Sequence, residues 1–221
     1  RLLGKVVQRY KPILGRLFVE DASTKQSDGK PNFTGEADDI ALIQFSSGTT
    51  AAPKPVALTH RQILANIAAL SDYGKPIPTD HLVSWLPLYH DMGLIGGLIS
   101  VVVNQGSVTL LQPEDFVAKP HVWLRTMSRH RGTISTAPNF AYELCSNRIA
   151  DADLRDVNLS TWRLALCGAE PIAAGSLERF GERFGKFGFS SNALKPVYGL
   201  AEAVLGVTFA LRDRSFRTEE F

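Results

Sequence analysis

The sequence has little cysteine for its 221 residues. Only Cys145 and Cys167 are present, both in apolar surroundings, and neither belongs to a C-x-x-C pair. This pattern favours buried free thiols in a reducing cytosol over a disulfide, so we expect a cytoplasmic protein.

Long hydrophobic runs and a strong net charge are also missing. The longest apolar stretch, Met92–Val103, is too short and too rich in glycine to span a bilayer, and there is no signal peptide. The net charge of +2 gives no reason to expect nucleic acid or a membrane surface as a partner. There is no initiating methionine, and the chain starts inside a helical pattern, which predicts a piece of a longer polypeptide.

What is present is typical of an ordinary globular protein, with 44% hydrophobic and 21% charged residues. Predicted strands alternate with predicted helices, which indicates the α/β class, with sheets flanked by helices. At the start of the chain we expect a helix over residues 1–11, a strand over 15–19 and a polar loop over 21–39. Later strands are expected at 40–45, 81–86, 107–111, 133–136, 162–167 and 195–197.

A capping box of Thr59 and Gln62 predicts a helix that stops near Gly74. Its spacing places five apolar residues on one face: Ile63, Leu64, Ile67, Ala68 and Leu70.

The most informative stretch is Ile40–Leu58, in which a predicted buried strand is followed by a cluster of hydroxyls and one lysine. The candidate phosphate-binding residues are Ser46, Ser47, Gly48, Thr49, Thr50 and Lys54. Short donors, inward-turned amides and a cation suit phosphate oxygens. Such clusters are also typical of plain turns, so these residues alone leave both interpretations open. A P-loop NTPase is excluded, because Lys54 lies between Pro53 and Pro55 and no G-K-[ST] occurs.

Three further groups of residues follow predicted strands, at the positions where α/β sheets place ligand groups. His90 lies in P-L-Y-H-D-M-G, Gly168 opens G-A-E-P, and Tyr198 opens Y-G-L-A-E. Taken singly, the groups of His90 and Tyr198 are better explained as structural junctions. The stretch P-N-F-A-Y-E-L-C predicts a loop and then a helix that buries Phe140, Leu144 and Cys145.

Together, and in this order, these stretches resemble the adenylate-forming enzymes. W-L-P-L-Y-H-D-M-G and P-N-F-A-Y-E-L-C are more similar to fatty acyl-AMP ligases than to CoA ligases. The resemblance spans residue 40 to about residue 209 and implies one partial domain of the large N-terminal part of that fold. Its expected regions are 1–39 (leading elements), 40–130 (phosphate loop) and 131–221 (adenine and magnesium site).

The resemblance also implies roles for residues. The hydroxyl loop and Lys54 would bind the β- and γ-phosphates of ATP, and His90 would stabilise charge near the carboxylate and the α-phosphate. Gly168, Ala169 and Glu170 would contact adenine, Tyr198 with Gly199 would stack on it, and Glu202 would hold Mg²⁺. Asn139 and Phe140 would border the substrate. The predicted catalytic residues are therefore His90, Lys54 and Glu202.

The implied reaction joins a fatty acid to ATP, giving acyl-adenylate and pyrophosphate, with later transfer to an acyl carrier protein. The rest of the polypeptide, including a small C-terminal domain with the catalytic lysine, would be needed, so we expect these residues alone to be almost inactive. Two alternatives stay open: a long-chain CoA ligase, and a degenerate nucleotide-binding or scaffold module. The second is motivated by Ala51 and Pro55, which stand where the family usually has glycine and reduce backbone freedom.

Overall fold

The computed structural model describes residues 35–46 and 54–218. All but Gly35 belong to a compact unit, Glu36–Phe221. The helix and strand predicted before residue 20 lie outside the described residues, as do most of the polar loop and the residues 47–53 of the hydroxyl loop.

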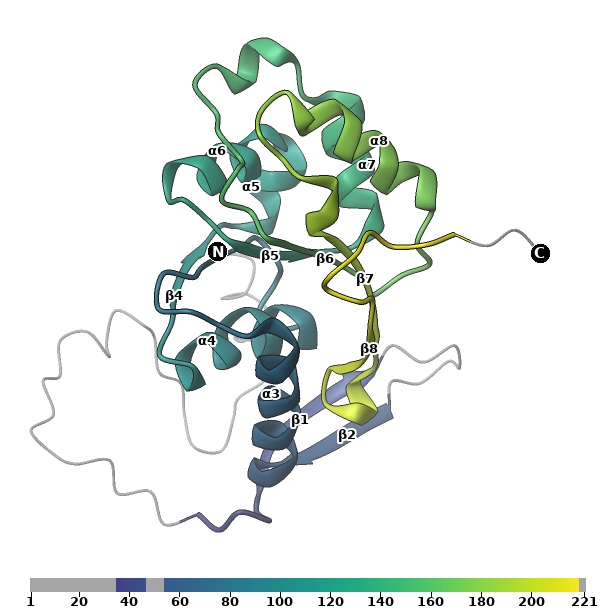
Figure 1. Ribbon diagram of the computed structural model, residues 1–221. Coiled ribbons are helices and arrows are strands. Elements are labelled where there is room, and N and C mark those ends of the chain that lie inside the picture. Colours follow the sequence, from purple (N-terminus) through teal and green to yellow (C-terminus); the bar gives the residue numbers. More distant parts are fainter. Residues whose placement is uncertain (1–34, 47–53, 219–221) are drawn as a thin grey trace, which may run out of the picture. The chain divides into compact units, whose positions relative to one another are not determined.

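A six-stranded sheet organises this unit, in the order β4-β3-β5-β6-β7-β8 (Figure 1). Its strands are β3 (His81–Ser84), β4 (Ser107–Leu110), β5 (Ile134–Ala137), β6 (Leu164–Cys167), β7 (Leu194–Gly199) and β8 (Gly206–Phe209). All neighbours are parallel except β7 and β8, which are antiparallel. The predicted α/β class is confirmed, and strands from both sides of residue 130 share this one sheet.

Helices cover both faces of the sheet (Figure 1). On one face lie α5 (Pro113–Ala118), α6 (His121–Arg129), α7 (Asn139–Arg148) and α8 (Ala174–Gly185). On the other lie α3 (His60–Gly74), a π-helix η1 (Met92–Ile99) and α4 (Ser100–Val103). Short 3₁₀ turns η2 (Asp151–Leu154), η3 (Ser191–Ala193) and η4 (Ala201–Ala203) lie in the connections.

The main core lies under α6, α7 and α8. Trp123, Trp162 and Phe180 meet there, with ring centroids 5.1 Å apart for the two tryptophans and 6.1 Å for Trp162 and Phe180. Leu177 and Phe184, which lie on α8 with Phe180, are fully buried as well. Burial of side chains of this size supplies most of the hydrophobic stabilisation.

The predicted capping box of α3 is confirmed. Thr59 Oγ1 accepts a hydrogen bond from the Gln62 amide (3.2 Å), and Gln62 Oε1 accepts one from the Thr59 amide (2.9 Å). The helix ends at Gly74, and Ile63 and Ile67 are buried. Leu64, predicted on the same face, is 51% exposed, because it lies at the edge of that apolar face.

The prediction of a buried strand at 40–45 is wrong. The strand exists as β1 (Ile40–Ser46), but among the described residues it pairs only with β2 (Lys54–Thr59), antiparallel, outside the six-stranded sheet. Such a pair buries one face of its alternating side chains. Leu42 packs on a small core with Leu58 and Ile67, whereas Ile43 and Phe45 are more than half exposed.

Burial of Phe140 by α7 was also predicted wrongly. Phe140 is 44% exposed, while Ala141, Tyr142 and Cys145 are fully buried. The buried stripe of the helix therefore follows the spacing of Ala141 and Cys145, four residues apart, and the Phe140 ring lies beside that stripe.

One ion pair ties α3 to the sheet. Asp80, before β3, is 9% exposed; Arg163, before β6, donates from Nε to Asp80 Oδ1 (2.8 Å) and from Nη2 to Oδ2. Arg163 Nη1 also donates to the carbonyl of Gly74, the last residue of α3 (3.0 Å). Burial alone would raise the pKa of Asp80, but the hydrogen bonds from Arg163, the Ile77 amide and Thr133, with the charge of Arg163, lower it overall.

No helix among the described residues combines the length and the apolar character needed to cross a bilayer.

We predict that Asp80→Asn lowers the free energy of unfolding by about 2 kcal/mol at pH 7, because the partly buried Arg163 loses its charged partner. Urea unfolding measures this. Because the folded-state pKa of Asp80 is depressed, its contribution is complete above the unfolded-state pKa of about 3.9 and is lost as the pH falls through the folded-state value. The variant should therefore lose less stability than the parent chain over that acid range.

The matched control is Asp38→Asn, which breaks a bidentate pair with Arg61 (2.7 and 2.9 Å) whose side chains are mostly exposed. Exposed pairs contribute little, so no measurable change is expected. Equal effects of the two substitutions would contradict a special role for Asp80.

Candidate functional site

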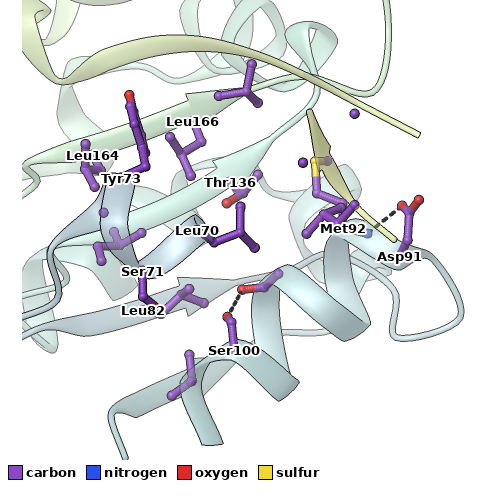
Figure 2. A pocket seen from close by; sticks show the side chains of 18 of the residues that line it. Leu70, Ser71, Tyr73, Leu82, Asp91, Met92, Ser100, Thr136, Leu164 and Leu166 are labelled. Carbon is purple, nitrogen blue, oxygen red and sulfur yellow. Dashed lines mark hydrogen bonds between the residues drawn. The ribbon is translucent and has the colours of Figure 1, made fainter. Parts of the chain in front are cut away.

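A cavity of about 1180 Å³ lies between the sheet and the helices α3, η1 and α4. Figure 2 shows Leu82, Thr136, Leu164 and Leu166 on the sheet side and Leu70 and Tyr73 on α3. Alternate residues of β5 and β6 line it, while Ser135, Ala137, Ala165 and Cys167 between them are buried under α6–α8. The interior is therefore an apolar floor of parallel strands, of a size that suits a small molecule or an acyl chain.

The polar residues predicted from sequence meet at one rim of this cavity. His90 follows β3, Ala169 follows β6, Tyr198 and Gly199 end β7, and Glu202 lies in η4 after β7. All five line the cavity. The carboxyl ends of these parallel strands reach the same edge of the sheet, which is why segments more than a hundred residues apart come together.

His90 is held by the next residue. Its Nδ1 lies 2.7 Å from Asp91 Oδ1, and the His90 side chain is half exposed whereas that of Asp91 is 13% exposed. Asp91 Oδ1 also accepts from the Met92 amide (2.6 Å; Figure 2). The hydrogen bond to Asp91 raises the pKa of His90, burial opposes this, and the negative charge of Asp91 adds to the rise. The protonated imidazole therefore persists to a higher pH than it would without Asp91.

The turn after β6 needs unusual backbone geometry. A Cβ on Gly168 would lie 2.8 Å from the carbonyl oxygen of Val197, closer than real Cβ contacts, so glycine is required for the close packing with β7. Ala169 has a φ of +70°, in the left-handed region that non-glycine residues rarely adopt. Ala169 is exposed and lines the cavity, so a flat group bound there can lie against its backbone.

The Tyr198–Glu202 segment turns just as tightly. A Cβ on Gly199 would lie 1.9 Å from the Leu205 carbonyl oxygen, so the turn into η4 requires glycine. Tyr198 is 60% exposed and Glu202 is exposed. Within the described residues no three His, Cys, Asp or Glu side chains gather as a metal site. One accessible carboxylate does fit Mg²⁺, which commonly takes one or two carboxylates and completes its shell with phosphate oxygens and water.

Lys54, another predicted site residue, is not among the residues that line the cavity. Ser46 ends β1 and pairs in register with Lys54, an exposed residue that begins β2. The same hairpin contributes Gln44 and Phe45 to the lining. The remaining loop residues, Ser47, Gly48, Thr49 and Thr50, lie outside the described residues.

Asn139, Phe140, Gly168 and Glu170 are likewise not among the lining residues. Asn139 is 7% exposed, and its Oδ1 accepts from the Ala173 amide (3.2 Å). The roles of all these residues stay predictions.

Some lining residues were missed from sequence. Thr136 and Leu166 look like ordinary strand residues. The alternation along their strands predicts which residues share a face of the sheet, but it does not predict that a cavity lies on that face. Gln44 is more distinctive: its Nε2 is buried and has no hydrogen-bond partner among the described residues. A buried unpaired donor is costly, but nothing in the strand pattern identified it.

The chain was compared with protein families and with known proteins. The model of the family described as AMP-binding enzyme matches residues 4–219. The chain is 38% identical to 4-hydroxyphenylalkanoate adenylyltransferase of Mycobacterium tuberculosis over 203 residues, covering 90% of this chain and 32% of that protein. It is 35% identical to the medium-chain-fatty-acid acyl-carrier-protein ligase TtuA of Teredinibacter turnerae, covering 79% and 27%.

A solved fatty acyl-adenylate ligase from L. pneumophila, in complex with acyl adenylate and pyrophosphate, superposes with a TM-score of 0.80. It is 36% identical and covers 82% of this chain and 32% of that one. The chain thus spans about a third of the length of the proteins it matches. The family model covers nearly the whole sequence, and the resemblance carried by the strand-end motifs is confirmed: the chain belongs to the AMP-binding enzyme family.

Proposed function

We propose that this chain is part of a fatty acyl-AMP ligase, which activates a fatty acid with ATP to acyl-adenylate and pyrophosphate. The observation that carries the proposal is that His90, Ala169, Tyr198 and Glu202 line the same cavity as the apolar floor formed by Leu82, Leu164 and Leu166. A reaction between a nucleotide and an apolar acid needs such a boundary, with the carboxylate at the rim and the chain inside. Transfer of the acyl group to a carrier protein in the cytoplasm, by the complete polypeptide with its C-terminal part, belongs to the same proposal.

Each rim residue has a role within this reaction. The carboxylate oxygen of the acid attacks the α-phosphorus, and the bond to the bridging oxygen breaks as pyrophosphate leaves, so no protein nucleophile is needed. Protonated His90 donates to the developing negative charge. The left-handed turn at Ala169 and the ring of Tyr198 enclose adenine.

Lys54 and the neighbouring hydroxyl loop would hold the departing pyrophosphate. Glu202 would hold Mg²⁺, which neutralises phosphate charge when bound. Leu82, Leu164 and Leu166 exclude water from the acyl chain, and Asn139 and Phe140 border the acid from α7.

A direct test compares this chain with the full-length polypeptide that contains it. With palmitate, ATP and Mg²⁺, the full-length protein should form acyl-AMP and release pyrophosphate, whereas residues 1–221 alone should give little or no turnover. Product analysis by mass spectrometry separates the outcomes. Acyl-CoA formation when CoA is added would favour a CoA ligase, and failure to bind a non-hydrolysable acyl-AMP mimic would favour a degenerate module.

The pH dependence follows from the His90–Asp91 pair. Because the pKa of His90 is raised, the protonated donor persists to higher pH, and kcat/KM should fall as the pH rises through that pKa. In Asp91→Asn the hydrogen bond to a charged acceptor and the charge itself are lost, so the pKa drops and the alkaline limb should move to lower pH. Rate profiles of the full-length enzyme measure this shift.

The matched control for that experiment is Asp115→Asn, which alters an exposed carboxylate in the first turn of α5. Its profile should coincide with that of the parent enzyme. An unmoved alkaline limb in Asp91→Asn would contradict the assignment of His90 as the protonated donor.

A further inference from the structure

The side chain of Glu170 makes a contact that a purely adenine-binding role does not require. Its Oε1 accepts a hydrogen bond from the backbone amide of Phe140 at 2.7 Å. Phe140 is the second residue of α7, a ten-residue helix whose N-cap is Pro138 and has no side-chain hydrogen bond. The first amides of a helix need acceptors, and an acid there is favoured by the helix dipole. Glu170, thirty residues later in the chain, supplies the missing acceptor.

A second bond runs in the opposite direction between the same two segments. Asn139 Oδ1 accepts from the Ala173 amide at 3.2 Å, and Asn139 is almost fully buried. The N-terminus of α7 and the segment Gly168–Ala173 are therefore joined at two points: a carboxylate of the segment binds the helix, and an amide oxygen of the helix binds the segment.

One of the joined segments lines the cavity, whereas the other carries the two residues predicted to border the acid. Ala169, next to Glu170, lines the rim of the cavity in its left-handed conformation. Phe140 presents a half-exposed ring edge-on to Trp85, with centroids 6.0 Å apart. A shift of the segment against α7 would move the nucleotide surface relative to this aromatic group.

We propose that Glu170 is a positioning residue that fixes the turn at Ala169 against the N-terminus of α7, and so sets the nucleotide and acid subsites at a constant separation. The proposal rests on the proposed function for its catalytic consequence, whereas the coupling itself is a property of the fold. Glu170 acts through the Phe140 amide and not through contact with the base.

Hydrogen exchange followed by NMR tests the coupling in this chain without any ligand. In Glu170→Ala the Phe140 and Ala173 amides should both exchange about fivefold faster, as expected for loss of a helix cap. Glu170→Gln keeps an acceptor oxygen and should restore most of the protection. Glu182→Ala, the same change at an exposed site on α8, should leave both amides unaffected.

A double variant separates capping from coupling. Pro138→Asp gives α7 a local N-cap, so Pro138→Asp/Glu170→Ala should recover the Phe140 protection and the urea midpoint but not the Ala173 protection. Recovery of both amides would show that Glu170 only caps the helix and would overturn the proposal. Unchanged exchange in Glu170→Ala alone would overturn it as well.

Kinetics of the full-length enzyme then test the consequence. Glu170→Ala should raise KM for both ATP and the fatty acid about fivefold, with rescue in Glu170→Gln but not in the double variant, and with an unchanged preference for ATP over ITP. An effect on KM for ATP alone, with an altered ATP/ITP ratio, would show base contact and contradict positioning. If the parent enzyme forms no acyl-adenylate, the proposed function fails, while the exchange measurements still decide the coupling.

Discussion

The arrangement of the cavity depends on the pairing of Asp80 with Arg163 at the amino-terminal edge of the sheet. The pair joins the start of β3, the start of β6 and the last carbonyl of α3. At the other side of α3, the Asn66 side chain donates to the Gly206 carbonyl (3.0 Å) and accepts from its amide (3.2 Å), and Tyr73 Oη donates to the Ala210 carbonyl (2.8 Å). The helix is thus fixed by polar contacts in its middle, at Asn66, and at its C-terminal end, at Tyr73 and Gly74. An apolar cavity can persist beneath it because these contacts, and not the filling of the space, hold the helix in place.

Features that depend on nearby residues could be predicted from the sequence, whereas features that depend on packing between distant elements could not. The capping box at Thr59 is a local signal, and the structure confirmed it. The carboxyl ends of parallel strands all lie at one edge of the sheet. The predicted positions of His90, Tyr198 and Glu202 at strand ends therefore already implied that they meet. The burial of β1 and Phe140 was predicted wrongly because burial depends on which other elements arrive, and periodicity carries no such information.

Contacts between residues far apart in the sequence also could not be predicted. Spacing and composition do not predict that Glu170 caps α7 across thirty residues. They also do not predict that Nε2 of Gln44 is buried without a hydrogen-bond partner among the described residues. The π-helix η1 is a further example. Glycine allows close packing at its start, because a Cβ on Gly93 would lie 2.2 Å from the Pro87 carbonyl oxygen. The wider helical winding that accompanies this packing was not predictable from the residues.

The division of the site into an apolar interior and a polar rim has a consequence for the chemistry. A carboxylate is a weak nucleophile when hydrated, and an acid whose chain occupies the cavity brings its carboxylate to the rim with part of that hydration removed. The groups at the rim are backbone turns fixed by Gly168 and Gly199, together with His90 held by Asp91, so their dipoles do not have to reorganise during the reaction. Preorganised donors of this kind contribute most where water is excluded. In the proposed reaction the sheet floor and the rim therefore act together: the leucines that would bind the acyl chain would also create the surroundings in which His90 is most effective.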